Sequence, residues 1–146
     1  MWQKIQQIMI LIDTSIWINV LGKKQSASYA NALQELVAGR DIVLTRFQQL
    51  ELLQGCNSEK EWLRLSDYLE GQDYLETQSS TWKSAARIFY ELRKKGVTVR
   101  SPVDCCIAQI AIENRVLLIH NDRDFDVIAK SFPLQHKRFQ LHLGSE

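Results

Sequence analysis

Acidic residues follow the two most apolar stretches of the chain. Asp13 comes directly after the apolar run 9–12, and Asp122 and Asp124 follow a second run, 116–119. A strand that is apolar throughout is buried on both faces, as in a parallel sheet covered by helices. If these two strands are parallel neighbours, their acids meet at the carboxyl edge of the sheet, where open α/β sheets bind ligands. Several carboxylates there would suit a divalent cation and the hydrolysis of phosphodiester bonds.

Two further acids are candidates for the same place. Glu51 lies four residues after Phe47, so both side chains share one face of a helix and Glu51 points toward the interior. Asp104 lies in the first turn of a helix that begins at Ser101-Pro102, which places it near the mouth of the expected site.

Each acid also has a purely structural interpretation. Asp104 could complete a capping pattern with Ser101, and Asp124 could cap the helix that follows it. Asp13 could end its strand in a turn, and Glu51 could be half exposed on its helix. These alternatives do not explain why acids recur at the ends of the two most apolar strands.

Electrostatics favours a metal ion if the acids meet. Two carboxylates about 4 Å apart repel by about 4 kcal/mol at an effective dielectric constant near 20. Mg²⁺ or Mn²⁺, which prefer oxygen ligands, would compensate a cluster of four or five. His120 is the histidine nearest to these acids in the sequence, and it stands alone as a residue at a strand end.

Strands and helices alternate along the chain, which predicts an α/β fold with a parallel sheet. The expected strands span 9–12, 41–45, 73–77 (an edge strand), 116–119 and 139–143. The expected helices include 26–38, 47–55, 58–71, one around Trp82 to Phe89 that ends at Gly96, one from Ser101, and one after Asp122. Four aromatic residues at helical spacing are expected in the core, or alternatively on a partner groove: Trp17, Trp62, Trp82 and Phe89.

Length and composition are those of one soluble globular domain. The chain has 146 residues, 45% hydrophobic and 24% charged, with a net charge of +1. That balance argues against a wide basic face for nucleic acid but does not exclude a local site. No apolar run approaches the roughly 20 residues of a membrane span. The cysteine spacing indicates a reducing, cytoplasmic protein. We expect a single domain over 9–146, with 1–8 as an N-terminal extension.

Four motifs in order resemble the PIN domain, and more narrowly the VapC-type toxin ribonucleases of toxin–antitoxin pairs. The motifs are Ile10-Leu11-Ile12-Asp13-Thr14-Ser15, Leu50-Glu51-Leu52-Leu53-Gln54-Gly55, Asp104-Cys105-Cys106-Ile107-Ala108 and Leu118-Ile119-His120-Asn121-Asp122-Arg123-Asp124-Phe125. The resemblance spans about 9–143. It implies a three-layer α/β/α sandwich around a central parallel sheet.

The resemblance also implies a site and an activity. The acidic site would comprise Asp13, Glu51, Asp104 and Asp122, with Asp124 matching a further metal-shell acid and Ser15 a supporting hydroxyl. The activity would be Mg²⁺- or Mn²⁺-dependent endoribonuclease cleavage of structured RNA such as tRNA or rRNA. A VapB-type antitoxin and a homodimer would be the protein partners, with no membrane involved.

From the residues themselves, Asp13 and Asp104 are the best candidates for direct metal ligands. Asp122 and Asp124 would complete the shell directly or through water. Glu51 would either hold a metal-bound water or act as a base, and the spacing does not separate these roles.

Other functions fit the pattern less well. A phosphatase that uses Asp13 as nucleophile would need a second Asp where Ser15 stands. A phosphoacceptor receiver domain would need a Lys after the strand 116–119. A non-catalytic α/β domain with a vestigial acidic site is the remaining alternative.

Overall fold

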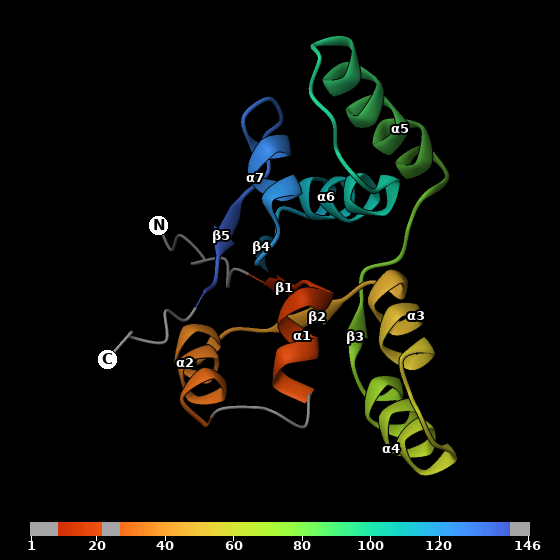
Figure 1. Cartoon of the computed structure of the whole chain (residues 1–146), viewed down its shortest axis with the longest axis vertical. Helices are drawn as coiled ribbons and strands as arrows, with labels where there is room; N and C mark the ends of the chain where they lie inside the picture. The colour runs from red at the N-terminus through yellow and green to blue at the C-terminus, as the bar shows by residue number, and fades with distance from the viewer. Residues whose placement is uncertain (1–8, 22–26, 141–146) are drawn as a thin grey trace, which may run out of the picture.

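A five-stranded parallel sheet forms the centre of the molecule (Figure 1). The computed structural model describes residues 9–21 and 27–140, and the expected extension 1–8 lies outside them. The strands are β1 (Ile10–Ile12), β2 (Ile42–Leu44), β3 (Asp73–Tyr74), β4 (Leu117–His120) and β5 (His136–Arg138). Their order is β3-β2-β1-β4-β5, so β1 lies in the middle and β3 at an edge.

Helices cover both faces of this sheet. They are α1 (Thr14–Leu21), α2 (Ala27–Val37), α3 (Arg46–Gln54), α4 (Glu59–Glu70), α5 (Ser79–Lys94), α6 (Pro102–Asn114) and α7 (Arg123–Ala129). Leu11 and Val43 pack with α5, α6 and α7, whereas Ile10, Ile12 and Leu44 pack with α1 to α4. Alternate residues of the strands thus face two separate cores. The expected three-layer α/β/α sandwich is confirmed.

Local sequence signals explain several helix ends. Gly39 follows the expected helix 26–38 and Gly96 is the predicted stop after Phe89; both have positive φ, 73° and 78°, a conformation that favours glycine. The Ser58 hydroxyl accepts a hydrogen bond from the N–H of Glu61 at 3.1 Å and begins α4. The Glu61 carboxylate accepts from the N–H of Asn57, one residue before the partner that a capping box would give it.

The prediction of a last strand over 139–143 is wrong. The strand is β5, three residues earlier, and 141–143 lie outside the described residues. The Phe139 N–H still donates to the carbonyl of His120 at 2.7 Å, while the Phe139 ring packs edge-on against Tyr29. The edge strand itself is polar and is held by backbone hydrogen bonds.

Two of the four aromatics expected in the core are exposed. Trp17 is buried and Phe89 is half-buried against the core, as expected. Trp62 and Trp82 are 43% and 51% exposed, so the core assignment is wrong for them. Helical spacing alone does not tell a core-facing stripe from an apolar stripe on the surface. Across residues 9–21 and 27–140, no helix combines the length and apolarity that a membrane crossing requires.

A buried glutamine joins β1 to α3. The Gln48 amide donates to the carbonyl of Ile12 at 2.9 Å and accepts from the N–H of Thr45 at 2.6 Å. Ile12 is the last residue of β1, and Thr45 directly precedes α3. Gln48 itself has no exposed surface. It therefore fixes the start of α3 against the carboxyl end of the central strand.

We expect Gln48→Leu to lower the free energy of unfolding by at least about 2 kcal/mol, because it leaves two buried backbone groups without partners. Urea denaturation would measure this loss. Gln54→Leu, at an exposed position of the same helix, is the matched control and should change stability by less than about 0.5 kcal/mol. Equal effects of the two substitutions would contradict the bridging role of Gln48.

Candidate active site

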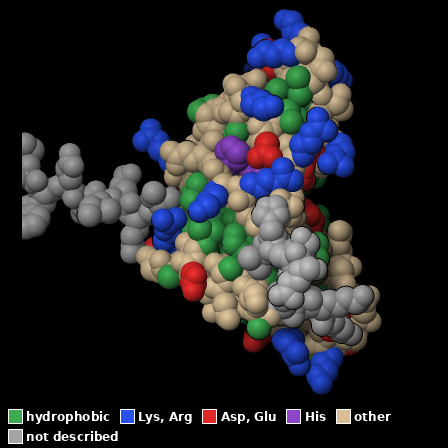
Figure 2. All heavy atoms as spheres, turned by 60° about the vertical axis from the view of Figure 1, so that its left-hand side comes forward, with side chains coloured by type: hydrophobic (Ala, Val, Ile, Leu, Met, Phe, Trp, Pro, Cys, Tyr) green, Lys and Arg blue, Asp and Glu red, His purple; other side chains and the backbone are tan. Residues whose placement is uncertain are grey.

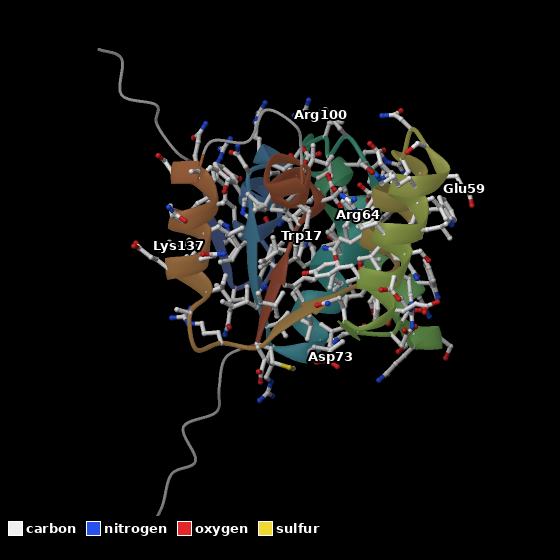
Figure 3. The ribbon with its side chains drawn as sticks, turned by 90° about the horizontal axis from the view of Figure 1, so that it is seen from below. Trp17, Glu59, Arg64, Asp73, Arg100 and Lys137 are labelled. Atoms are coloured by element: carbon white, nitrogen blue, oxygen red, sulfur yellow. The ribbon has the colours of Figure 1, made fainter. Side chains whose placement is uncertain are left out.

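The carboxyl ends of β1 and β4 lie side by side. The two strands pair in parallel, with Ile12 opposite Ile119, and the Asp13 N–H donates to the carbonyl of Ile119 at 2.9 Å. Asp13 and the segment after β4 therefore share one edge of the sheet. Figure 3 shows Arg100 at this end of the molecule and Asp73, which begins β3, at the opposite end.

Three carboxylates meet at this edge. Oxygen atoms of Asp104, Asp122 and Asp124 all lie within 4.8 Å of one another. Asp122 precedes α7 and its side chain accepts from the N–H of Asp124 at 2.9 Å. Asp104 comes from the first turn of α6, whose start is capped by the Ser101 hydroxyl. Two helix N-termini thus deliver the three acids to one place.

The environment of Asp104 strongly favours its protonated form. Burial raises the pKa of Asp104 to about 8, and the neighbouring carboxylates Asp122, Asp124 and Asp13 add to the rise. Like charges near one another disfavour ionisation, and removal from water adds to this cost. A cation among these oxygens would relieve both effects.

Asp13 and Glu51 extend the cluster on the side of β1. Burial raises the pKa of Asp13, against the opposing effect of the Ser15 hydroxyl, which donates to its Oδ2 at 2.7 Å. Burial also raises the pKa of Glu51, and the charge of Asp13 adds to that rise. The Ser15 hydroxyl in turn accepts from the N–H of Asn121 at 3.4 Å. Ser15 therefore links the two strand ends that carry the acids.

The structure supports the turn role considered for Asp13 but not the capping roles considered for Asp104 and Asp124. The Ser101 hydroxyl accepts from Val103, and the Asp104 carboxylate faces other acids. The cap of α7 is Asp122, whereas Asp124 is buried and its Oδ2 accepts from the N–H of Arg100 at 3.1 Å. Asp13 accepts from both groups of Ser15, so its turn role and its place in the cluster coexist.

The expectation that His120 stands alone is wrong. Its Nε2 lies 3.0 Å from Nδ1 of His136, and Asp126 Oδ1 lies 3.8 Å from the first atom and 3.6 Å from the second. The Nδ1 of His120 accepts from the N–H of Asp122 at 3.1 Å. Its proton therefore lies on Nε2, which donates to His136. Burial lowers the pKa of His120 to about 4, so the ring is neutral and holds the backbone of Asp122 in place.

Sequence reasoning missed this histidine pair because the spacing of the two residues along the chain does not indicate that they meet. His136 is 16 residues further along the chain and lies on the edge strand β5. Only the pairing of β4 with β5, which sets His120 opposite Arg138, brings the two rings together. The one available signal was a histidine at the end of an apolar strand.

The chain matches a family model. The model of the PIN domain matches residues 10–131, most of the chain. The chain belongs to the PIN domain family. The match includes Asp13, Glu51, Asp104, Asp122 and Asp124, so the acids described above all lie within the PIN domain.

Relatives of this PIN domain are VapC ribonucleases. The VapC ribonuclease Mb1587 of Mycobacterium bovis and ribonuclease VapC11 of Mycobacterium tuberculosis are each 33% identical over 136 residues, covering 90% of this chain and 100% of the relative. Ribonuclease VapC51 of Mycobacterium tuberculosis is 29% identical over 119 residues, covering 82% of this chain and 84% of the relative.

Solved structures share the fold at lower identity. VapBC2 from Rickettsia felis, solved with a promoter DNA fragment, superposes with a TM-score of 0.73 at 21% identity and covers 91% of this chain and 100% of that one. FitAcB from Neisseria gonorrhoeae gives a TM-score of 0.69 at 18% identity, with coverage of 88% and 96%. These matches agree with the α/β/α fold of the PIN domain.

The raised pKa of Asp104 predicts how metal-free stability depends on pH. The folded protein holds this proton more tightly than the unfolded chain, whose ordinary value is 3.8. The contribution of Asp104 to stability is therefore largest at low pH and falls as pH rises from about 4 to about 8. Thermal melting in chelator would measure the fall, and Asp104→Asn should flatten it.

The control for this experiment is Asp67→Asn, at an exposed position of α4, which should leave the pH dependence as it is. Added Mg²⁺ should restore the stability of the parent protein near pH 8. A drop of several degrees in the melting temperature of Asp104→Asn, with an unchanged pH profile, would instead show that Asp104 acts as a helix cap.

Proposed function

We propose that this PIN domain is a divalent-metal-dependent endoribonuclease, the toxin of a type II toxin–antitoxin pair. The observation that carries the proposal is the group of three carboxylates within 4.8 Å at the carboxyl edge of the sheet. Burial at this edge raises the pKa of Asp104 to about 8, and the charges of the neighbouring carboxylates add to the rise. The names of the VapC relatives supply the reaction class.

The donor set fits a hard cation. All the candidate ligand atoms at the site are carboxylate oxygens, from Asp13, Asp104, Asp122 and Asp124, which are the ligands that Mg²⁺ and Mn²⁺ prefer. Such an ion, when bound, lowers the pKa of a water molecule and stabilises the charge of a phosphate oxygen. Mg²⁺ and Mn²⁺ are both consistent with these ligands.

The other site residues have separate roles. Burial and the charge of Asp13 raise the pKa of Glu51, which makes it a stronger proton acceptor than an ordinary carboxylate. It therefore serves either as the base for the attacking water or as the group that positions that water. Ser15 orients Asp13, and His120 holds the backbone of Asp122. The substrate is structured RNA such as tRNA or rRNA.

We expect Asp13→Asn and chelator each to abolish cleavage of RNA. The loss should exceed the roughly 10–100-fold effect of removing a merely supporting group of a metal site. Gel analysis of a labelled total-tRNA or rRNA pool with Mg²⁺ or Mn²⁺ would measure it, with Asp67→Asn as the control. Cleavage that survives both treatments in a pure sample would point to a different mechanism.

The partner of the toxin would be a small VapB-type antitoxin. Solved structures with this fold include DNA-bound VapBC from Salmonella typhimurium and VapBC-5 from Mycobacterium tuberculosis, a member of the VapBC family of toxin-antitoxin systems. The chain exposes large apolar side chains on α1 and α4, among them Ile18, Trp62, Leu63 and Tyr68, and an amphipathic antitoxin segment could cover them. We also propose a homodimer, for which Leu50 and Trp82 around a pocket of about 180 Å³ offer further apolar surface.

Expression of the intact chain alone should arrest bacterial growth. Co-expression of the small protein encoded beside it should relieve the arrest, and so should Asp13→Asn without any partner. Growth curves after induction, with immunoblots to equalise protein levels, would measure both effects. Harmless accumulation of the parent chain at the level that its Asp13→Asn variant reaches would contradict the toxin assignment.

A further inference from the structure

Basic residues are concentrated in one segment of the chain. Residues 79–100, which comprise α5 and the connection to α6, contain six of the 18 basic residues and one of the 17 acidic ones. This segment therefore carries a net charge of +5, and the remainder carries −4. Figure 2 shows Lys and Arg side chains over the upper part of the molecule, at the height that α5 occupies in Figure 1.

Four side chains of α5 form a single exposed stripe. Lys83, Arg87, Tyr90 and Lys94 are spaced by four, three and four residues, so they lie along one face of the helix, and all four are exposed. The stripe is about 16 Å long at 1.5 Å per residue. The opposite face of α5 packs into the core through Ala85, Ile88 and Leu92.

The stripe combines positive charge with an exposed aromatic ring. Tyr90 is 44% exposed, and the Arg87 guanidinium and the Lys94 ammonium lie 5.0 and 6.0 Å from the centre of its ring. The single acid of the segment, Glu91, pairs with Arg87 at 2.5 Å but leaves the other cations unopposed within the stripe. Cations that follow a backbone and a ring that stacks on bases are the two features of single-stranded nucleic-acid surfaces.

The basic segment ends at the acidic site. Arg100, its last residue, donates its N–H to Asp124 Oδ2 at 3.1 Å, and its Nε lies 4.0 Å from Oδ1 of the same carboxylate. The Arg100 side chain is 78% exposed, so it stays available to a phosphate. At the other end of the helix, Thr81 donates to Glu113 at 2.9 Å and fixes α5 against α6, which carries Asp104.

We propose that the stripe of α5 binds the RNA strand that leads away from the cleavage site. Lys83, Arg87 and Lys94 contact its phosphates, and Tyr90 stacks on a base. The proposal rests on the ribonuclease function proposed above. It assigns to α5 the affinity for long RNA, while the acids act on one phosphodiester.

Helix α4 offers a matched control. Lys60 and Arg64 are exposed, are of the same types as Lys83 and Arg87, and share their four-residue spacing. They differ in their surroundings, because α4 contains four acidic residues against two basic ones. The double variants K83Q/R87Q and K60Q/R64Q therefore remove the same number of positive charges, the first from a basic helix and the second from an acidic one.

Binding would be measured by fluorescence anisotropy with a labelled single-stranded RNA of mixed sequence, on an Asp13→Asn background and at several salt concentrations. K83Q/R87Q should weaken binding and make the plot of log Kd against log salt shallower by about 1.4, at 0.7 for each phosphate that is no longer neutralised. Y90A should weaken binding about fivefold or more, whereas Y90F should bind as the parent does. K60Q/R64Q should change neither quantity.

Equal Kd values and salt slopes for the two double variants would overturn the proposal and leave a protein partner as the occupant of the stripe. Melting temperatures within a few degrees of the parent would exclude misfolding as the cause.

In the chain that keeps Asp13, K83Q/R87Q should raise KM for RNA. If the native chain cleaves RNA while the α4 and α5 double variants have the same Kd and salt slope, the RNA-binding role of the stripe is wrong but the ribonuclease function stands. If the native chain cleaves no RNA, the proposed function fails.

Discussion

The pairing of β1 with β4 is the constraint on which the site depends. These strands come from opposite ends of the chain, and their parallel register sets Ile12 beside Ile119, so the residues after them are forced together. Those residues are acids, and their repulsion is a cost that the folded protein bears in the absence of a cation. The core on both faces of the sheet supplies the free energy that holds them there. The site is therefore organised before any ion arrives, which is the condition for tight and selective binding.

Neutral polar groups surround this charged cluster and make it rigid. Gln48 connects the end of β1 to α3, Ser15 spans from Asp13 to the segment after β4, and His120 accepts from the backbone of Asp122. The first two join segments that carry different acids, and the third fixes the backbone of Asp122 within the segment after β4. Because two of these groups are completely buried, the loss of a partner would cost more than an exposed bond contributes. Three uncharged residues thus fix the positions of charged residues that would otherwise move apart.

The sequence predicted the fold and the membership of the acidic cluster better than it predicted the surroundings. Unbroken apolar runs before Asp13 and Asp122 indicated buried parallel strands, and the sheet confirms them. The roles of the acids stay predictions, because no contact distinguishes a ligand from a base. The polar strand β5 was placed three residues late, since an edge strand is held by backbone groups that leave no side-chain pattern. The pair of His120 and His136 follows from that same strand, and so it was missed as well.

Net charge conceals how this chain distributes its charges. A total of +1 is typical of a protein without a broad basic surface, yet the segment 79–100 carries +5 and the remainder −4. The electrostatic effects of the basic segment and of the acidic site extend over different distances. Exposed cations on α5 are screened beyond about 8–10 Å at physiological salt, whereas the partly buried carboxylates beside Arg100 are screened much less. A polyanion would therefore meet attraction along α5 and repulsion at the acids, and a bound cation would remove that repulsion. Metal binding and RNA binding would on this argument be coupled: each should strengthen the other, although α5 and the carboxylates share no ligand atom.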